Sequence, residues 1–250
     1  MSELIPQKAI VLAAGLGRRM RPLTETIPKP LVLVDGKTLI DHALDRLESA
    51  GVKEVIINTF YLAEILEQHL RKRKSPKILI SRENELLDTG GGVNNMLKVL
   101  EDAPFYVINS DAFWLNGPFD TLIRLAETWE EKTMDGLLLL HSTVEAFGYN
   151  GKGDFCSDSN GSLSRRLESQ VSPWLFTGIQ LLHPRLFKNA PDGVFSLNVL
   201  YDKAIESERL FGTVHDGKWF HVGSPKDLKE TEIYMQQRYA TNRPGTRHRS

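Results

Sequence analysis

A glycine-rich turn directly after a short apolar run constrains the fold more than any other feature of the chain. Residues 9–14 read AIVLAA, which predicts a buried strand that ends in the turn Gly15-Leu16-Gly17. Because these glycines carry no Cβ, the chain can bend sharply there and bring several backbone N–H groups against an anion. A strand that leads into such a turn is how an α/β fold presents a phosphate site. The sequence therefore predicts an α/β fold with an anion site at this turn.

Positive charges crowd the segment that follows the turn. The four cations of residues 18–29 are Arg18, Arg19, Arg21 and Lys29. This density suits a triphosphate better than a neutral ligand. The dinucleotide-binding pattern G-x-G-x-x-G is excluded because Met20 occupies the position of its third glycine.

Composition narrows the class of protein. With 31 Lys and Arg against 32 Asp and Glu, the net charge is −1, so no basic field indicates a nucleic-acid partner. Cys156 is the one cysteine, which excludes an internal disulfide and is typical of a reducing compartment. No apolar run approaches the length of a membrane span, and the first residues lack the apolar core of a signal peptide. We expect a cytoplasmic protein, monomeric or homodimeric, without a membrane partner.

The length predicts one large domain. A chain of 250 residues can bury a sizeable core, and no six-residue repeat indicates an appended solenoid. We expect a single domain over residues 1–240. Within it, glycine, serine and asparagine interrupt short alternating pieces at about 145–175, which predicts a small β-rich lid. Residues 241–250 lack apolar anchors, and we expect them to form a disordered tail.

Apolar runs and helical spacings alternate along the chain. After the first strand, the expected strands are residues 31–34, 55–57, 78–80, 105–109, 136–141, 176–182, 210–215 and 219–223. The expected helices are residues 39–47, 62–70, 93–100, 119–132, 197–208 and 225–239. Asp111 follows the strand at 105–109. Because ligands sit outside the carboxyl ends of strands in open α/β sheets, we expect Asp111 to share a rim with Gly15 and Gly17.

Three consecutive glycines stand out before the helix expected at 93–100. Gly90, Gly91 and Gly92 follow Thr89, and such a run costs backbone entropy on folding. A simple connector has no need of it. We therefore expect the backbone here to lie close to a flat ligand.

Several motifs together carry a family resemblance. LAAGLGRRMRPLT at 12–24 with PKPL at 28–31 resembles the opening of the sugar-1-phosphate nucleotidyltransferase family, whose pattern is roughly L-A-A-G-x-G-x-R-x-x-P-L-T followed by P-K-P. Later segments resemble the branch of this family that makes UDP-N-acetylmuramate from N-acetylmuramate 1-phosphate. Those segments are LLDTGGGV at 86–93, INSDAFW at 108–114, GKGDF at 151–155, FTGIQLLHP at 176–184 and WFHVGSP at 219–225. The resemblance covers about residues 8–228, nearly the whole chain.

This resemblance implies a Rossmann-like, mixed and mainly parallel sheet flanked by helices, with the lid recognising the sugar. The implied reaction is an in-line attack of the sugar phosphate on the α-phosphorus of UTP, assisted by Mg²⁺. By its place in the family motif, Arg19 holds the β- and γ-phosphates, Lys29 bridges the α-phosphate and the sugar phosphate, and Asp111 holds Mg²⁺. The residues implied for the nucleotide are Leu12, Ala13, Ala14, Gly15, Gly17, Thr89, Gly90 and Gly91. Those implied for the sugar are Asn109, Asp154, Glu168 and Asn198.

The chain departs from the family pattern at His221. The family motif W-x-D-[VI]-G has an aspartate there, which is the second carboxylate on the metal. Imidazole can ligate a divalent ion, but it is neutral and suits softer ions than Mg²⁺. Metal ligation, binding of substrate phosphate and simple packing therefore all stay open for His221.

Two other interpretations also stay open. The first is a transferase of the same type for another base or acceptor, such as mannose 1-phosphate or phosphocholine, because the loop reads only phosphates. The second is a regulatory protein that binds a nucleotide sugar without turning it over. This interpretation stays open because His221 replaces the aspartate of the family motif. Against the second interpretation, the full set of phosphate-binding residues is present.

Overall fold

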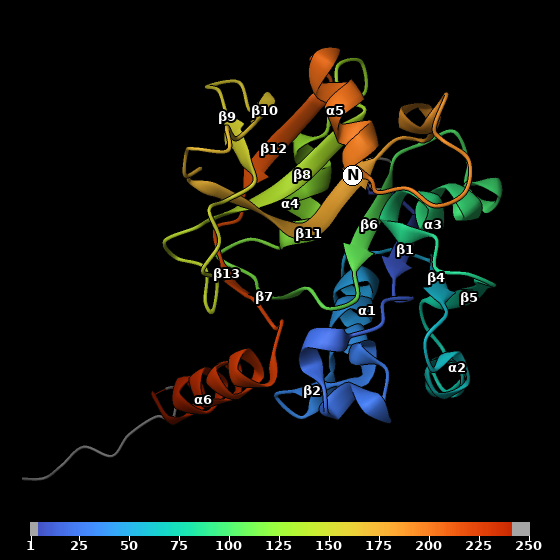
Figure 1. Cartoon of the computed structure of the whole chain (residues 1–250), viewed down its shortest axis with the longest axis vertical. Coiled ribbons are helices and arrows are strands. Elements are labelled where there is room, and N and C mark those ends of the chain that lie inside the picture. Colours follow the sequence, from blue (N-terminus) through green and yellow to red (C-terminus); the bar gives the residue numbers. More distant parts are fainter. Residues whose placement is uncertain (1–4, 242–250) are drawn as a thin grey trace, which may run out of the picture.

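The computed structural model describes residues 5–241, and it has the expected α/β architecture. A nine-stranded sheet is flanked by helices, and two short two-stranded sheets lie beside it (Figure 1). The strands are β1 (Lys8–Leu12), β2 (Leu33–Val34), β3 (Lys37–Thr38), β4 (Glu54–Thr59), β5 (Lys77–Arg82), β6 (Phe105–Asn109), β7 (Phe113–Leu115), β8 (Gly136–Ser142), β9 (Phe155–Ser157), β10 (Leu163–Arg165), β11 (Trp174–Leu182), β12 (Leu210–Val214) and β13 (Lys218–Phe220). The α-helices are α1 (Leu39–Ser49), α2 (Ala63–Leu70), α3 (Asp88–Met96), α4 (Thr121–Thr128), α5 (Asn198–Glu206) and α6 (Pro225–Thr241).

The order of the strands confirms a mixed, mainly parallel sheet. The path is β10-β9-β11-β6-β1-β4-β5, and β8 joins β11 to β12. Strands β6, β1, β4 and β5 run parallel to one another, so their carboxyl ends share one edge of the sheet. Strand β11 runs antiparallel to both β6 and β8. Strands β9 and β10 extend the sheet beyond β11 and lie within residues 145–175, which we call the lid segment.

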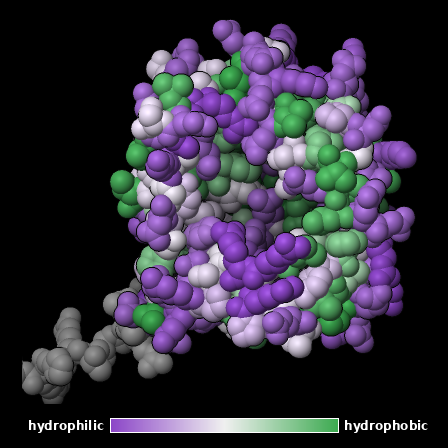
Figure 2. Space-filling view, viewed as in Figure 1, coloured by the Kyte–Doolittle hydropathy of each residue, from purple (hydrophilic) through white to green (hydrophobic). Residues whose placement is uncertain are grey.

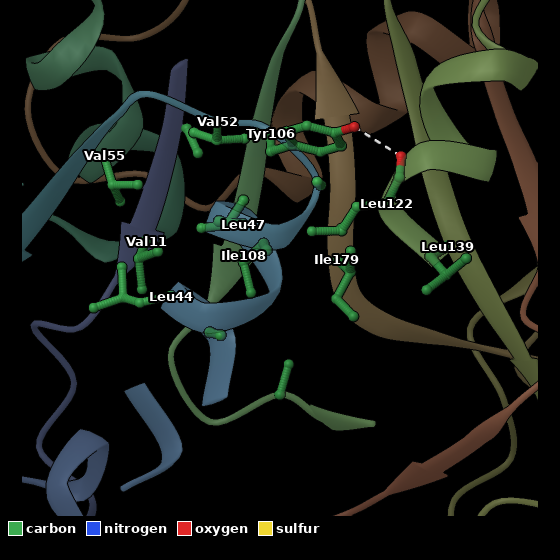
Figure 3. Close-up of a cluster of buried hydrophobic side chains, with 14 of the residues drawn as sticks. Val11, Leu44, Leu47, Val52, Val55, Tyr106, Ile108, Leu122, Leu139 and Ile179 are labelled. Atoms are coloured by element: carbon green, nitrogen blue, oxygen red, sulfur yellow. Dashed lines mark hydrogen bonds between the residues drawn. The ribbon is translucent and has the colours of Figure 1, made fainter. Parts of the chain in front are cut away.

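Alternation along the central strands builds two cores, one on each face of the sheet. Val11, Ile57 and Ile108 face a first core that includes residues of α1, α2 and α4. Their neighbours Ile10 and Ile56 face a second core with residues of α3 and α5. Figure 3 shows the first core, where the Tyr106 hydroxyl donates a 2.7 Å hydrogen bond to the carbonyl oxygen of Leu122.

A third, smaller core lies apart from the main sheet. Its fully packed members are Met20, Val32, Val34, Leu39, Phe113, Phe220, Val222 and Met235. They come from the segment after β1, from β2, from the start of α1, from the paired strands β7 and β13 with the residues after β13, and from α6. Helix α6 lies away from the large sheet and close to β2 (Figure 1). Within residues 5–241, no helix combines the length and the apolar character needed to span a bilayer.

Most expected elements differ by a few residues in their bounds, and two helices differ most. Helix α4 is shorter than the expected 119–132 at both ends. The Asp120 carboxylate accepts the backbone N–H groups of Leu122 and Ile123 and caps the start, and the helix ends at Thr128 because Trp129 has an extended backbone. Helix α3 begins at Asp88, so the glycines expected before the helix lie inside it. The tail predicted at 241–250 lies outside the described residues except for residue 241.

Candidate active site

A cleft of about 570 Å³ opens at the carboxyl edge of the parallel strands. Figure 2 shows this side of the molecule hollowed near its centre, with strongly hydrophilic residues along the lower rim of the hollow. The cleft is lined by Leu12, Ala13, Ala14, Gly15, Gly17, Arg18, Arg19, Met20, Lys29, Pro30, Asn58, Glu83, Leu86, Asp88, Thr89, Asn109, Ser110, Asp111, Val194 and Gly223. Ten of the predicted site residues thus lie around one space, at the edge where an open α/β sheet binds its ligands.

The turn after β1 is fixed by one glycine. Gly17 has a φ of 60° and caps a short 3₁₀ helix at Arg18–Met20, a left-handed conformation that glycine adopts readily. A Cβ on Gly17 would come within 3.2 Å of the side chain of Lys29. The Thr24 hydroxyl donates a 2.8 Å hydrogen bond to the carbonyl oxygen of Gly17. The turn is therefore held closed, with Arg18 and Arg19 on the lining of the cleft.

Lys29 and Asp111 meet across the floor of the cleft. The Lys29 ammonium donates to the Asp111 carboxylate over 2.5 Å, and the two side chains are 13% and 39% exposed. Lys29 begins the 3₁₀ helix Lys29–Leu31, whereas Asp111 follows β6, so the pair joins two distant segments. Both charged groups lie on the lining of the cleft, so each is accessible to a ligand there.

The third core positions these charged residues. Met20 is fully buried in it and follows Arg19 directly, and Phe113 follows Asp111 by two residues. Val32 ends the turn that begins at Lys29, since its N–H donates to the carbonyl oxygen of Lys29. Each cleft side chain is thus anchored by an apolar neighbour in the same small cluster. Rigid placement of charge in this manner is what electrostatic catalysis requires.

His221 lies between two buried members of the same core, Phe220 and Val222. Its ring contacts Tyr149 and Trp219, with centroids 6.3 and 5.9 Å away. Burial lowers the pKa of His221, and the charge of Arg19 lowers it further, so both favour the neutral imidazole. A Cβ on Gly223 would come closer than 3.0 Å to the ring, so this glycine makes room for it. The prediction that His221 ligates a metal stays a prediction.

Comparison with known proteins identifies the family. The nucleotidyl transferase family matches residues 8–163. The chain belongs to this family. It is 39% identical over 237 residues to an N-acetylmuramate α-1-phosphate uridylyltransferase from Caulobacter vibrioides, covering 93% of this chain and 98% of the relative. It is 33% identical over 229 residues to the protein of the same name from Neisseria meningitidis serogroup B, covering 90% of this chain and 96% of the relative.

A solved structure agrees on the fold. UDP-glucose pyrophosphorylase in complex with UDP-glucose superposes with a TM-score of 0.73 at 17% sequence identity, covering 93% of this chain and all of the other. The family resemblance expected from the motifs is therefore confirmed. The chain is a member of the sugar-1-phosphate nucleotidyltransferases.

The donor set of this nucleotidyltransferase fits a shared Mg²⁺ ion. Within residues 5–241, no group of three or more His, Cys, Asp or Glu could enclose a metal ion by itself. Asp111 supplies a carboxylate beside Lys29 on the lining of the cleft. In nucleotide enzymes Mg²⁺ is often held by one or two carboxylates together with substrate phosphates and water. The residues present fit an ion that Asp111 shares with a bound triphosphate.

In the glycine triplet Gly90-Gly91-Gly92, the first two glycines allow helix α3 to pack closely against the segment around Phe195. A Cβ on Gly90 would overlap the ring of Phe195, and a Cβ on Gly91 would overlap the carbonyl oxygen of Gly193, both closer than 3.0 Å. The N–H groups of Gly90 and Gly91 both donate to the carbonyl oxygen of Phe195, at 2.9 and 3.0 Å. The expectation that these glycines precede the helix is wrong, since α3 begins at Asp88. Thr89 lines the cleft, whereas Gly90 and Gly91 do not.

Asn58 and Glu83 are among the cleft residues that the sequence analysis did not single out. The Asn58 side chain accepts the N–H of Ala13 at 2.6 Å and donates to Glu83 at 2.8 Å. Glu83 also accepts the N–H of Leu87 at 3.2 Å, and burial raises its pKa. The network thus ties the phosphate turn to the start of α3. Asn58 lies at the carboxyl end of β4 and Glu83 directly after β5, the position that singled out Asp111, so the same signal could have found them.

The predicted sugar residues are not all brought together. Asn109 lines the cleft at the end of β6, next to Gly178, whose φ is 81°. Asp154 accepts the N–H of Phe176 at 2.8 Å, and Asn198 accepts from Arg165 at 2.9 Å, so both side chains hold other parts of the protein. Glu168 is exposed in the lid segment. Of these four residues, only Asn109 lies on the lining of the cleft.

Proposed function

We propose that this chain transfers the uridylyl group of UTP to N-acetylmuramate 1-phosphate, giving UDP-N-acetylmuramate and pyrophosphate. The observation that carries the proposal is the contact between Lys29 and Asp111 on the floor of a cleft bounded by the glycine turn. The names of two relatives with nearly full mutual coverage support this base and this acceptor. The setting we propose is the reuse of cell-wall amino sugars in the cytoplasm.

The chemistry requires charge neutralisation rather than a general base. A sugar 1-phosphate is largely a dianion at neutral pH, so its oxygen can attack without losing a proton. That oxygen forms a bond to the α-phosphorus while the bond from the α-phosphorus to the β-phosphate oxygen breaks, and pyrophosphate leaves with the electron pair. We assign Lys29 to the α-phosphate and the sugar phosphate, where it offsets their mutual repulsion. We assign Arg19 to the β- and γ-phosphates, where it stabilises the departing pyrophosphate.

Mg²⁺ would be held by Asp111 and would supply a further positive charge to the triphosphate. Lys29 lies within hydrogen-bond distance of the same carboxylate, which keeps both groups oriented before substrate arrives. Such preorganised charges lower the barrier without reorganising during the reaction.

Gly15 supports a ligand at the turn by a separate argument. A Cβ built on Gly15 meets no atom within 4 Å, and its φ is not positive. The folded protein alone therefore gives no reason for a glycine at this position. A ligand whose phosphates approach the backbone gives one, because a side chain would occupy that space.

The test is a pyrophosphate-release assay with purified protein and Mg²⁺. UTP, CTP and GTP are each combined with N-acetylmuramate, N-acetylglucosamine and mannose 1-phosphates, and the last two sugars serve as matched acceptors without the lactyl group. Rapid release with UTP and the muramate alone supports the proposal. Release with another pair keeps the mechanism and replaces the substrates. Nucleotide binding without release in any pair would support a non-catalytic binding protein.

A further inference from the structure

The lid segment contains three cations, and the structure distinguishes them by their partners. They are Lys152, Arg165 and Arg166. Arg165 donates to Asp202 at 2.6 Å and lies over the ring of Phe155, and Arg166 donates to four backbone carbonyl oxygens of the lid segment. The ammonium of Lys152 has neither a hydrogen bond nor an ion pair with any residue of the described range 5–241. Its charge is therefore open to a ligand.

The loop that carries Lys152 is built tightly. The carbonyl oxygen of Lys152 accepts the N–H of Ser172 at 2.8 Å, and the N–H of Gly153 donates to the Tyr149 hydroxyl at 3.1 Å. Gly153 has a φ of 76°, and a Cβ there would come within 3.0 Å of the carbonyl oxygen of Ser172. A Cβ on Gly151 would overlap the ring of Tyr149. Both glycines flanking Lys152 are thus needed for the loop to close around Tyr149, which fixes the backbone of the lysine.

Tyr149 connects this loop to the phosphate end of the cleft. Its ring packs edge-on against His221, with centroids 6.3 Å apart. His221 in turn lies within the electrostatic reach of Arg19, Lys29 and Asp111, whose charges all act on its pKa. The N–H of His221 also donates to the carbonyl oxygen of Phe147, two residues before Tyr149. Tyr149 and His221 therefore join the loop of Lys152 to the cleft, because the His221 ring lies against Gly223 on the lining. The flexible four-carbon stem of Lys152 extends the reach of its ammonium from this loop.

We propose that Lys152 selects acceptors that carry a second anion on the sugar, by pairing with the carboxylate of the lactyl group of N-acetylmuramate 1-phosphate. This inference rests on the proposed function. The phosphate of the acceptor is already matched by Lys29, so it does not distinguish one sugar 1-phosphate from another. The lactyl carboxylate, a few bonds from the anomeric carbon, does distinguish the muramate from other sugar 1-phosphates. A cation without a protein partner, such as Lys152, can recognise this carboxylate.

The experiment compares two acceptors in wild-type enzyme and three variants. We measure kcat/KM with UTP and either N-acetylmuramate or N-acetylglucosamine 1-phosphate, which differ by the lactyl group. Lys152→Gln removes the charge and keeps most of the stem, and Lys152→Arg keeps the charge. Lys53→Gln is the matched control, because Lys53 is also exposed but precedes β4 at the opposite edge of the sheet. A charged hydrogen bond predicts a roughly tenfold fall in the muramate preference of Lys152→Gln, carried by KM.

The outcomes separate this inference from the proposed function. A lowered preference in Lys152→Gln, restored in Lys152→Arg and unchanged in Lys53→Gln, supports the role of Lys152. Equal losses with both acceptors, or a preference equal to that of wild type, overturn it while the proposed function stands. Wild-type enzyme that does not prefer the muramate contradicts the proposed function, and the role of Lys152 falls with it.

Discussion

The replacement Gly91→Ala tests the claim that the glycine triplet serves packing. The new Cβ would come closer than 3.0 Å to the carbonyl oxygen of Gly193, a backbone atom that cannot rotate away. To remove this overlap, the segment around Phe195 must shift away from α3. That shift weakens the hydrogen bonds from the N–H groups of Gly90 and Gly91 to the carbonyl oxygen of Phe195.

The expected change in the free energy of unfolding of Gly91→Ala is the sum of two losses and one gain. Overpacking costs about 1–3 kcal/mol, and each weakened hydrogen bond costs about 1 kcal/mol. Alanine in a helix gains up to about 1 kcal/mol over glycine, which offsets part of this loss. We expect the free energy of unfolding to fall by about 3 kcal/mol, which lowers Tm by roughly 6–12 °C in a chain of this size.

Thermal and urea unfolding followed by circular dichroism measure the effect. Gly15→Ala is the matched control, because a Cβ there meets no atom within 4 Å. We expect Gly15→Ala to unfold like wild type while its KM for the nucleotide rises, and Gly91→Ala to show the lowered Tm. A Gly91→Ala protein as stable as wild type would refute the packing argument for the triplet.

Two further predictions concern charged and titratable groups. Lys29→Ala should keep the circular dichroism spectrum of wild type but lose roughly a hundred- to a thousandfold in kcat, since it removes one preorganised charge; near wild-type turnover would contradict its assignment. Burial lowers the pKa of His215 from 6.5 to about 4 in the folded protein. As the pH falls, the imidazole of the unfolded chain therefore binds a proton at a higher pH than that of the folded protein does. The free energy of unfolding should then drop by about 2 kcal/mol from pH 7 to pH 5 through this group. Urea titrations of wild type and His215→Gln at both pH values measure the difference, and equal drops in the two proteins would exclude this role.

The sequence predicts the central strands well because their signal is local. Val55 to Ile57 and Phe105 to Asn109 are apolar runs with β-branched residues, and both became buried strands. The place of β11 is not predictable in this way. It enters the sheet antiparallel between β6 and β8, and that choice depends on pairing between segments far apart in the chain.

The candidate site was predictable where a residue follows the carboxyl end of a strand. Gly15 and Asp111 meet this condition, and both line the cleft. Asn198 shows why the rest could not be predicted. A polar residue at a helix start can bind a ligand or a neighbouring side chain, and here its partner is Arg165, 33 positions away. Nothing near Asn198 in the sequence indicates that contact.

The lid strands and the phosphate end of the cleft pack in separate hydrophobic cores, which affects how substitutions in one region act on the other. Phe155 and Leu163 of the lid strands belong to the second core, whereas Met20 and Phe220 belong to the third. A substitution in β9 or β10 therefore repacks a cluster on which the phosphate-binding side chains do not rest. We expect relatives to differ in the acceptors they use while they keep the same transfer step. Replacing β9 and β10 by those of a relative should therefore change the acceptor without abolishing transfer.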